Sequence, residues 1–181
     1  AEHLGGYNVE LMEAHCARAL DDPRALAAIG MLGELVKLLP ERDPHPELYA
    51  TTLHVLRSFA EPDIWPALLV YWEMQLLQEI GFGLDLTSCA ATGSIEELVY
   101  VSPKSGRAVS REAGAPYADK MLALPQFLID SSAKLAPSDI VAGFGLTGFF
   151  LERDALAPHG LKFPDARERL LDLLRREAHA A

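Results

Sequence analysis

Apolar residues recur every three or four positions along most of the chain, which is the spacing of amphipathic α-helices. The clearest stretch is residues 23–39, which carry leucine, isoleucine or valine at positions 26, 29, 32, 36 and 39. Asp21 or Asp22 is a suitable N-cap, Pro23 suits the first turn, and Pro40 ends the pattern. This stretch predicts a helix with one buried face.

The same spacing predicts further helices over residues 9–20, 48–59 and 165–177, and a long one from an N-cap at Ser138 to Leu156. Two shorter helices are expected around residues 117–122 and 125–129. Residues 64–80, capped by Asp63, are apolar on almost every face. Such a helix is buried all round, so we expect it at the centre of the domain, with Gly81 or Gly83 as a left-handed cap at its end.

Residues 84–114 interrupt the helical pattern with two short apolar strands joined by a Pro-Lys-Ser-Gly turn. The sequence therefore predicts an all-α fold, a helical bundle with a small inserted β-hairpin. The hairpin has the outline of a degenerate zinc ribbon. A structural zinc site needs four sulfur or imidazole ligands, yet Cys89 is the one soft ligand here and the facing segment 109–113 offers serine and alanine. We expect a packed hairpin without metal, and no cofactor.

The segment 143–148 matches the pattern G-x-G-x-x-G of dinucleotide-binding proteins. That motif needs a strand before it and a helix after it, so that helix amides face the pyrophosphate. Here Pro137 and Ser138 begin a helix in which the glycines lie in the middle. We therefore expect the glycines to allow close helix packing instead of nucleotide binding.

Charge is unevenly distributed in this chain of 181 residues and net charge −10. Residues 1–100 have a balance of −11 and residues 101–181 a balance of +1. This balance argues against autonomous DNA binding, which depends on neutralising phosphates. The sequence contains no apolar run long enough to span a membrane. Its two cysteines form no disulfide framework, which favours a reducing cytoplasm; Cys16, in a helical pattern, is expected to be a small buried residue.

The six histidines match no catalytic motif, and we expect no enzyme activity. One group of residues remains as a candidate binding surface. It lies between the hairpin turn and the next helix and consists of Lys104, Arg107, Arg111, Tyr117 and Lys120. These cations are either solubilising surface charge or a site for an acidic peptide or a few phosphates.

Four segments together resemble the RecO family of bacterial recombination mediators over roughly residues 25–175. They are GFGLDLTSCAATG, LVYVSPKSGRAVSREAGAPY, LTGFFLERDAL and ARERLLDLL. The resemblance implies an N-terminal OB-fold, of which residues 1–8 are the last strand, followed by the helical domain over residues 9–181 with its insert at about 84–114. Some members carry a zinc ribbon and others a metal-free remnant. Cys89 matches the first ligand position, and Thr92, Ser110 and Ala113 match the other three.

The resemblance further implies a non-catalytic mediator of DNA repair and homologous recombination in the RecF pathway, in the cytoplasm and associated with the nucleoid. Expected partners are the acidic tail of single-stranded-DNA-binding protein, RecR, and single- and double-stranded DNA, the DNA mainly through the OB-fold; no membrane is expected. With RecR, such a protein helps RecA load at gaps. Arg167 matches the family's closing basic–acidic motif, so Arg167→Glu is expected to weaken partner binding without unfolding the protein. The alternative is an all-helical adaptor or regulatory domain that binds an unrelated protein.

Overall fold

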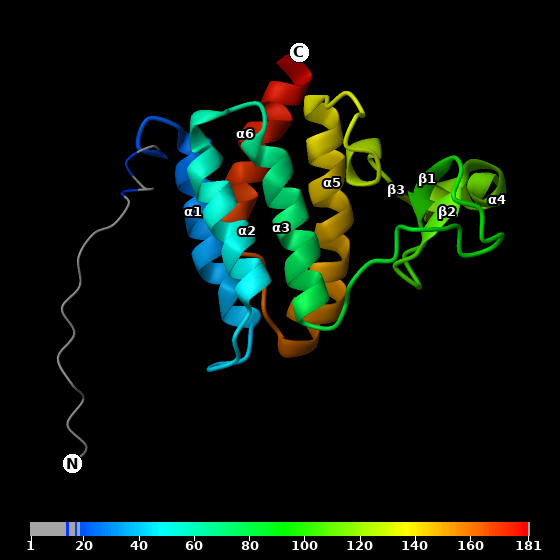
Figure 1. The fold of residues 1–181 in the computed structure, drawn as a ribbon, viewed down its shortest axis with the longest axis horizontal. Coiled ribbons are helices and arrows are strands. Elements are labelled where there is room, and N and C mark those ends of the chain that lie inside the picture. Colours follow the sequence, from blue (N-terminus) through cyan, green and yellow to red (C-terminus); the bar gives the residue numbers. More distant parts are fainter. Residues whose placement is uncertain (1–13, 15–16, 18, 181) are drawn as a thin grey trace.

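In the part of the chain that the structure describes, five long helices form a bundle, and a small sheet lies to one side of it (Figure 1). The computed structural model describes residues 14, 17 and 19–180. The predicted helix over residues 9–20 and the predicted burial of Cys16 lie almost entirely outside the described residues. The long helices are α1 (Pro23–Leu35), α2 (Pro46–Arg57), α3 (Trp65–Glu79), α5 (Pro137–Phe150) and α6 (Asp165–Ala180).

Neighbouring helices in the bundle follow the order α2, α3, α5, α6, α1. Helices α1, α3 and α5 begin at the end of the bundle where α2 and α6 finish (Figure 1). The prediction that α3 is buried is confirmed, since Trp65, Leu69, Trp72 and Leu76 are each 0% exposed. None of the described helices is long and apolar enough to cross a membrane.

Local signals explain several helix ends. The Asp22 carboxylate accepts a hydrogen bond from the Arg24 amide at 2.8 Å, as expected of an N-cap. Gly81, at φ +88°, ends α3, and the Phe82 amide donates to the Leu77 carbonyl at 2.7 Å in the pattern of a Schellman motif.

Two predicted N-caps were wrong by one or two residues. Ile64, and not Asp63, precedes α3. The N-cap of α5 is Ala136, and not Ser138; the Asp139 carboxylate accepts a hydrogen bond from the Ala136 amide at 3.0 Å. An acidic side chain three residues into the helix therefore satisfies the end of α5, where the N-cap residue itself is an alanine.

The insert contains one strand more than predicted. Strands β1 (Leu98–Val101) and β2 (Ala108–Ser110) form the expected antiparallel hairpin, and β3 (Leu122–Ala123) pairs with the other edge of β1. The expectation of a helix reaching residue 122 was therefore wrong at its end. Short helical segments complete the chain: α4 (Arg111–Gly114), the 3₁₀ segments η2 (Val36–Leu38), η3 (Ser58–Ala60), η4 (Ala115–Lys120), η5 (Gln126–Leu128) and η7 (Ala157–His159), and the π-helix η6 (Leu151–Leu156).

A buried ion pair lies at the centre of the bundle. The Arg167 guanidinium on α6 donates to both carboxylate oxygens of Glu73 on α3, at 2.7 and 3.0 Å. Glu73 is 0% and Arg167 2% exposed. Such a bidentate pair is the geometry in which two charges can be buried together, because each satisfies the other's hydrogen bonds.

Helix α5 completes the environment of this pair. The Phe144 carbonyl accepts a further hydrogen bond from Arg167 at 2.9 Å, and the Thr147 hydroxyl donates to Glu73. The guanidinium also lies 4.1 Å from the centre of the Phe163 ring. Burial lowers the pKa of Arg167, but the charge and hydrogen bonds of Glu73 outweigh burial and raise the pKa above its ordinary value. Arg167 therefore stays charged, and the pair, with its hydrogen bonds to α5, connects α3, α5 and α6.

This geometry corrects the expectation for Arg167. A side chain that is 2% exposed presents no surface to a partner. Glutamate at position 167 would place a second carboxylate against Glu73 inside the core, so the fold would not stay intact.

The glycine-rich segment lies in the middle of α5, as expected, and two of its glycines allow close packing. A Cβ atom on Gly143 would lie 2.9 Å from Val70 of α3, and one on Gly148 would lie 2.8 Å from the Arg167 guanidinium. A Cβ atom on Gly145 would meet nothing within 4 Å. The match to the dinucleotide motif is therefore a consequence of helix packing at two of its three positions.

The ion pair yields a stability prediction. Arg167→Met, which leaves the Glu73 charge buried and unpaired, should lower the free energy of unfolding by about 3–5 kcal/mol. The double variant Glu73→Leu with Arg167→Met should recover most of that loss, because no charge remains in the core. Urea titrations followed by the fluorescence of the buried Trp65 and Trp72 measure both. An Arg167→Met midpoint equal to that of the wild type would show that the pair does not hold the bundle together.

The glycines of α5 give a second prediction with an internal control. Gly145→Ala should leave the stability unchanged or raise it by up to about 1 kcal/mol, because alanine favours helix and the site is open. Gly148→Ala and Gly143→Ala should each lower it by about 1–3 kcal/mol through overpacking. Thermal unfolding by circular dichroism compares the three variants. Equal shifts for all three would mean that helix propensity, and not packing, decides these positions.

Candidate functional site

The tip of the insert is held against the end of the bundle. In the turn between β1 and β2, the Ser102 amide donates to the Arg107 carbonyl and the Gly106 amide to the Ser102 carbonyl, both at 2.9 Å. Gly106 has φ +66°, and a Cβ atom there would lie 3.1 Å from Leu84. This turn exposes Lys104 at its tip.

A pocket of about 220 Å³ lies where this turn meets the bundle, and we call it the junction pocket. Lys104 and Arg153 contribute its cations, and Phe82, which is 42% exposed, contributes an accessible aromatic ring. Its lining consists of Gly81, Phe82, Gly83, Leu84, Lys104, Ser105, Gly106, Phe150, Arg153 and Asp154.

Arg153 connects the two parts of the molecule at this pocket. It lies in η6, the π-helical continuation of α5, and donates a hydrogen bond to the Pro103 carbonyl in the turn. Its guanidinium lies 4.8 Å from the ring centre of Phe150 and pairs with Asp154 at 2.6 Å. The hydrogen bonds to Asp154 raise the pKa of Arg153, which secures its positive charge. π-Helical turns inside α-helices often occur at functional sites.

The structure divides the predicted cation cluster. The register of β3 on β1 places Lys120 at the same end of the sheet as Lys104, and both are exposed. Arg111 follows β2 at the opposite end and lies 3.8 Å from Glu97. Arg107 is engaged by Asp85 at 3.1 Å. Lys104, Arg107 and Lys120 therefore lie at one end of the sheet, and Lys104 and Lys120 are the two of these three for which no ion pair is recorded in the described residues.

Tyr117, the aromatic member of the predicted set, lies in η4 and is 56% exposed. Arg167 lies in the core, as described above. Sequence reasoning missed Arg153, which is far from the insert in the chain, and Phe82, which directly precedes the insert. Phe82 could have been found from its position: it is a large apolar residue between Gly81 and Gly83, directly after a helix ends.

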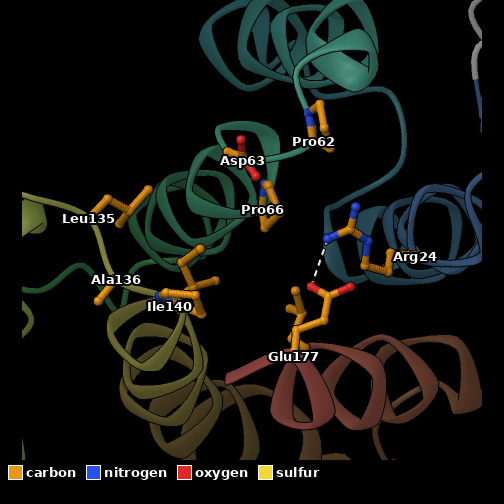
Figure 2. A pocket seen from close by; sticks show the side chains of 10 residues that line it. Arg24, Pro62, Asp63, Pro66, Leu135, Ala136, Ile140 and Glu177 are labelled. Atoms are coloured by element: carbon orange, nitrogen blue, oxygen red, sulfur yellow. Dashed lines mark hydrogen bonds and ion pairs between the residues drawn. The ribbon is translucent and has the colours of Figure 1, made fainter. Parts of the chain in front are cut away.

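A second pocket, of about 190 Å³, lies at the opposite end of the bundle, among the first turns of α1, α3 and α5 (Figure 2). Its side contains the ion pair between Arg24 and Glu177, with the Arg24 Nη1 atom 2.7 Å from the carboxylate. Arg24 also pairs with Asp22 at 3.1 Å. Because two carboxylates already occupy this guanidinium, the pocket is poorly suited to an anion, and the pair ties α1 to α6.

Cys89 occupies the packed interior of the insert. It is 1% exposed, and its Sγ atom accepts a hydrogen bond from the Ser110 amide at 3.3 Å. Burial raises the pKa of the thiol, but hydrogen bonds from the Ser110 and Thr92 hydroxyls and from the Ser110 and Ala91 amides outweigh burial and lower the pKa from 9.0 to about 6. Donors of this kind stabilise a thiolate.

These residues do not fit a zinc ion. Two hydroxyls stand near the Cys89 sulfur, and the remaining position, Ala113, carries a methyl group that packs against the core. Tetrahedral zinc needs four sulfur, imidazole or carboxylate ligands. Within the described part of the chain, no group of three or more histidine, cysteine, aspartate or glutamate side chains is placed to hold a metal ion.

The fold and the junction pocket together define an α-helical domain with a small antiparallel sheet and a cation-lined pocket between them. Comparison with known proteins identifies it further. The family model described as "Recombination protein O C terminal" matches residues 20–162. The chain belongs to this family, the RecO family of DNA repair proteins. No solved structure matches the chain significantly.

Curated relatives support this assignment. The chain is 49% identical over 172 residues to DNA repair protein RecO of Beijerinckia indica, covering 94% of this chain and 69% of the relative. It is 50% identical over 173 residues to DNA repair protein RecO of Bartonella henselae, covering 95% of this chain and 68% of the relative. The resemblance first seen in the motifs around Cys89 is thus confirmed over most of the chain.

The Cys89 environment predicts a pH dependence. Because the pKa of the thiol is lower in the folded state than its ordinary value of 9.0, the thiolate contributes stability that is fully present above pH 9 and is lost as the pH falls through about 6. Its contribution should change by no more than about 1.4 kcal/mol per pH unit within that window.

The measurement compares urea unfolding of the wild type and of Cys89→Ala between pH 6 and 9, with Cys16 replaced by serine in both. The difference in unfolding free energy between the two proteins should grow with pH. A difference that stays constant over this window would mean that Cys89 remains a neutral thiol in the folded protein.

Proposed function

We propose that this chain is a non-catalytic mediator of DNA repair and homologous recombination in the RecF pathway, and that its junction pocket binds the acidic C-terminal tail of single-stranded-DNA-binding protein. The observation that carries the proposal is that the exposed Lys104 and the exposed ring of Phe82 converge on one pocket, where Arg153, itself paired with Asp154, holds the turn against the bundle. A tail with carboxylates and an apolar end needs such a pocket, in which cations flank an apolar surface.

Family membership supports this assignment over the alternative of an unrelated adaptor domain. The relatives are DNA repair proteins by name, and they are similar to this chain along more than nine tenths of its length. In the proposal, the chain acts with RecR to help RecA load at gaps. An OB-fold would supply most contacts to single- and double-stranded DNA.

The charge distribution is consistent with this division of roles. The chain has a net charge of −10. Beside the junction pocket, Arg107 and Arg153 are already engaged by carboxylates. Lys104 and Lys120 are exposed cations at this end of the sheet, which is too few for the many phosphate contacts on which non-specific DNA binding depends. They suffice for a short acidic peptide.

Binding of a labelled peptide of the acidic tail, measured by fluorescence anisotropy, tests the proposal. Lys104→Glu should weaken binding about tenfold, equivalent to about 1.4 kcal/mol, because it removes an attractive charge and adds a repulsive one. Phe82→Ala should weaken it through lost apolar contact. Lys134→Glu is the matched control: Lys134 is exposed near the start of α5, at the other end of this helix from Arg153.

A labelled single-stranded oligonucleotide is measured beside the peptide across a salt titration. The proposal expects peptide binding that Lys104→Glu weakens and Lys134→Glu does not, with little oligonucleotide binding. If Lys104→Glu and Lys134→Glu weaken peptide binding equally, the peptide responds to the overall charge of the protein and does not bind specifically at the junction pocket. Tight, steeply salt-dependent oligonucleotide binding without peptide binding would assign the basic residues of the second half to DNA instead.

A further inference from the structure

A second surface of the insert has the opposite chemistry. At the end of the sheet away from the turn, a groove of about 440 Å³ runs between the insert and η5. Its base includes Leu86 and Leu98, which are 9% and 4% exposed, while Ile95 is 75% and Ile129 38% exposed. We call this surface the acidic groove; it is lined by Leu86, Thr87, Ile95, Leu98, Leu128 and Ile129.

The two exposed isoleucines come from segments that are far apart in the chain, and the fold fixes both segments. The Gln126 side chain, in η5, donates to the Leu98 carbonyl at 2.9 Å and so ties the segment that carries Ile129 to β1. On the other side, the Arg111 amide donates to the Glu97 carbonyl at 2.8 Å. The groove is therefore already formed, and a ligand would not have to order it.

Carboxylates flank the isoleucines. Glu96 and Glu97 follow Ile95, and Asp130 follows Ile129; all three are exposed. Arg111 lies 3.8 Å from Glu97, a long contact between two exposed side chains. The Asp130 carboxylate accepts hydrogen bonds from Ser132, which lower its pKa and keep it ionised. The side chains that line the groove are uncharged, and among the exposed residues next to them in the sequence carboxylates outnumber cations.

These observations select one kind of occupant. An anionic rim repels DNA and the acidic tail, so the function proposed for the junction pocket leaves this groove without a role. Apolar side chains exposed between carboxylates match a segment whose apolar residues are flanked by lysine or arginine. We propose that the acidic groove binds a basic, apolar segment of a partner protein, with its apolar side chains against Ile95 and Ile129 and its cations beside Glu96 and Asp130.

The probe for the test is a short labelled peptide in which two isoleucines, spaced three or four residues apart, stand among lysines. The same peptide with serine in place of both isoleucines separates apolar from purely electrostatic binding. The proposal expects the isoleucine peptide to bind the wild type at least about tenfold more tightly than the serine peptide does, in fluorescence anisotropy at moderate salt.

Two double variants address the two parts of the surface. Ile95→Ser with Ile129→Ser, and Glu96→Lys with Asp130→Lys, should each weaken binding of the isoleucine peptide about tenfold. Tyr49→Ser is the control for the isoleucine substitutions and Glu47→Lys the control for the charge reversals; both residues lie on the exposed side of α2. Neither control should change the affinity for the isoleucine peptide. Circular dichroism shows whether each variant folds, and the surface exposure of the changed side chains makes unfolding an unexpected result.

Three outcomes would overturn the proposal. They are failure of the wild type to bind the isoleucine peptide, equal binding of the two peptides, and equal weakening by the control variants. Sedimentation velocity provides a further arm. A concentration-dependent dimer that Ile95→Ser with Ile129→Ser abolishes would assign the groove to a second copy of this chain instead of a basic partner. Binding of the acidic tail at the junction pocket is measured separately, so either proposal can fail alone.

Discussion

The buried pair of Glu73 and Arg167 is the constraint on which the arrangement of the bundle depends. An unpaired charge in the core would be strongly unfavourable, so α3 and α6 must meet at one level and in one rotation. Helix α5 is bound by the same requirement, because it supplies the Phe144 carbonyl and the Thr147 hydroxyl and leaves room for the guanidinium at Gly148. One polar contact thus sets the relative positions of three helices that apolar packing alone would specify less uniquely.

The position of α5 in turn decides where the junction pocket lies. Arg153 follows Gly148 by five residues in one continuous helical segment that passes from α5 into η6. A rotation of α5 would therefore move Arg153 away from the Pro103 carbonyl and from the turn that exposes Lys104. Through this connection a substitution of Arg167 in the core would also displace Arg153 at the proposed binding surface. Its role is to position the elements, and the matching family motif is consistent with that role.

Much of the helical fold could be predicted from the sequence, because the helices depend on local patterns. The spacing of apolar residues before Pro40, the Asp22 cap and the left-handed Gly81 are signals contained within a few residues. The missing elements depend on distant partners. Strand β3 has two residues and exists because β1 lies beside it. In the sequence alone, Arg167 is one of several charged residues on its helix, and its burial follows only once Glu73 is placed opposite. Glu73 was the usable clue, since it is the one acidic residue within the apolar run of residues 64–77.

The candidate site also depends on contacts between residues that are distant in the sequence. These contacts show why the insert cannot be considered apart from the bundle. Cations that are close in sequence, such as Lys104 and Arg111, end at opposite ends of the sheet because β2 runs between them. With a third strand of two residues, this sheet is little more than a two-stranded hairpin, which is only marginally stable by itself. The hydroxyls around Cys89 cannot form the cross-link that a zinc ion would provide. Its stability must come from contacts such as those of Arg153 with the turn and of Gln126 with β1. These contacts also form the junction pocket and one side of the acidic groove. The interactions that stabilise the insert without metal are therefore the same ones that shape the surfaces at its two ends.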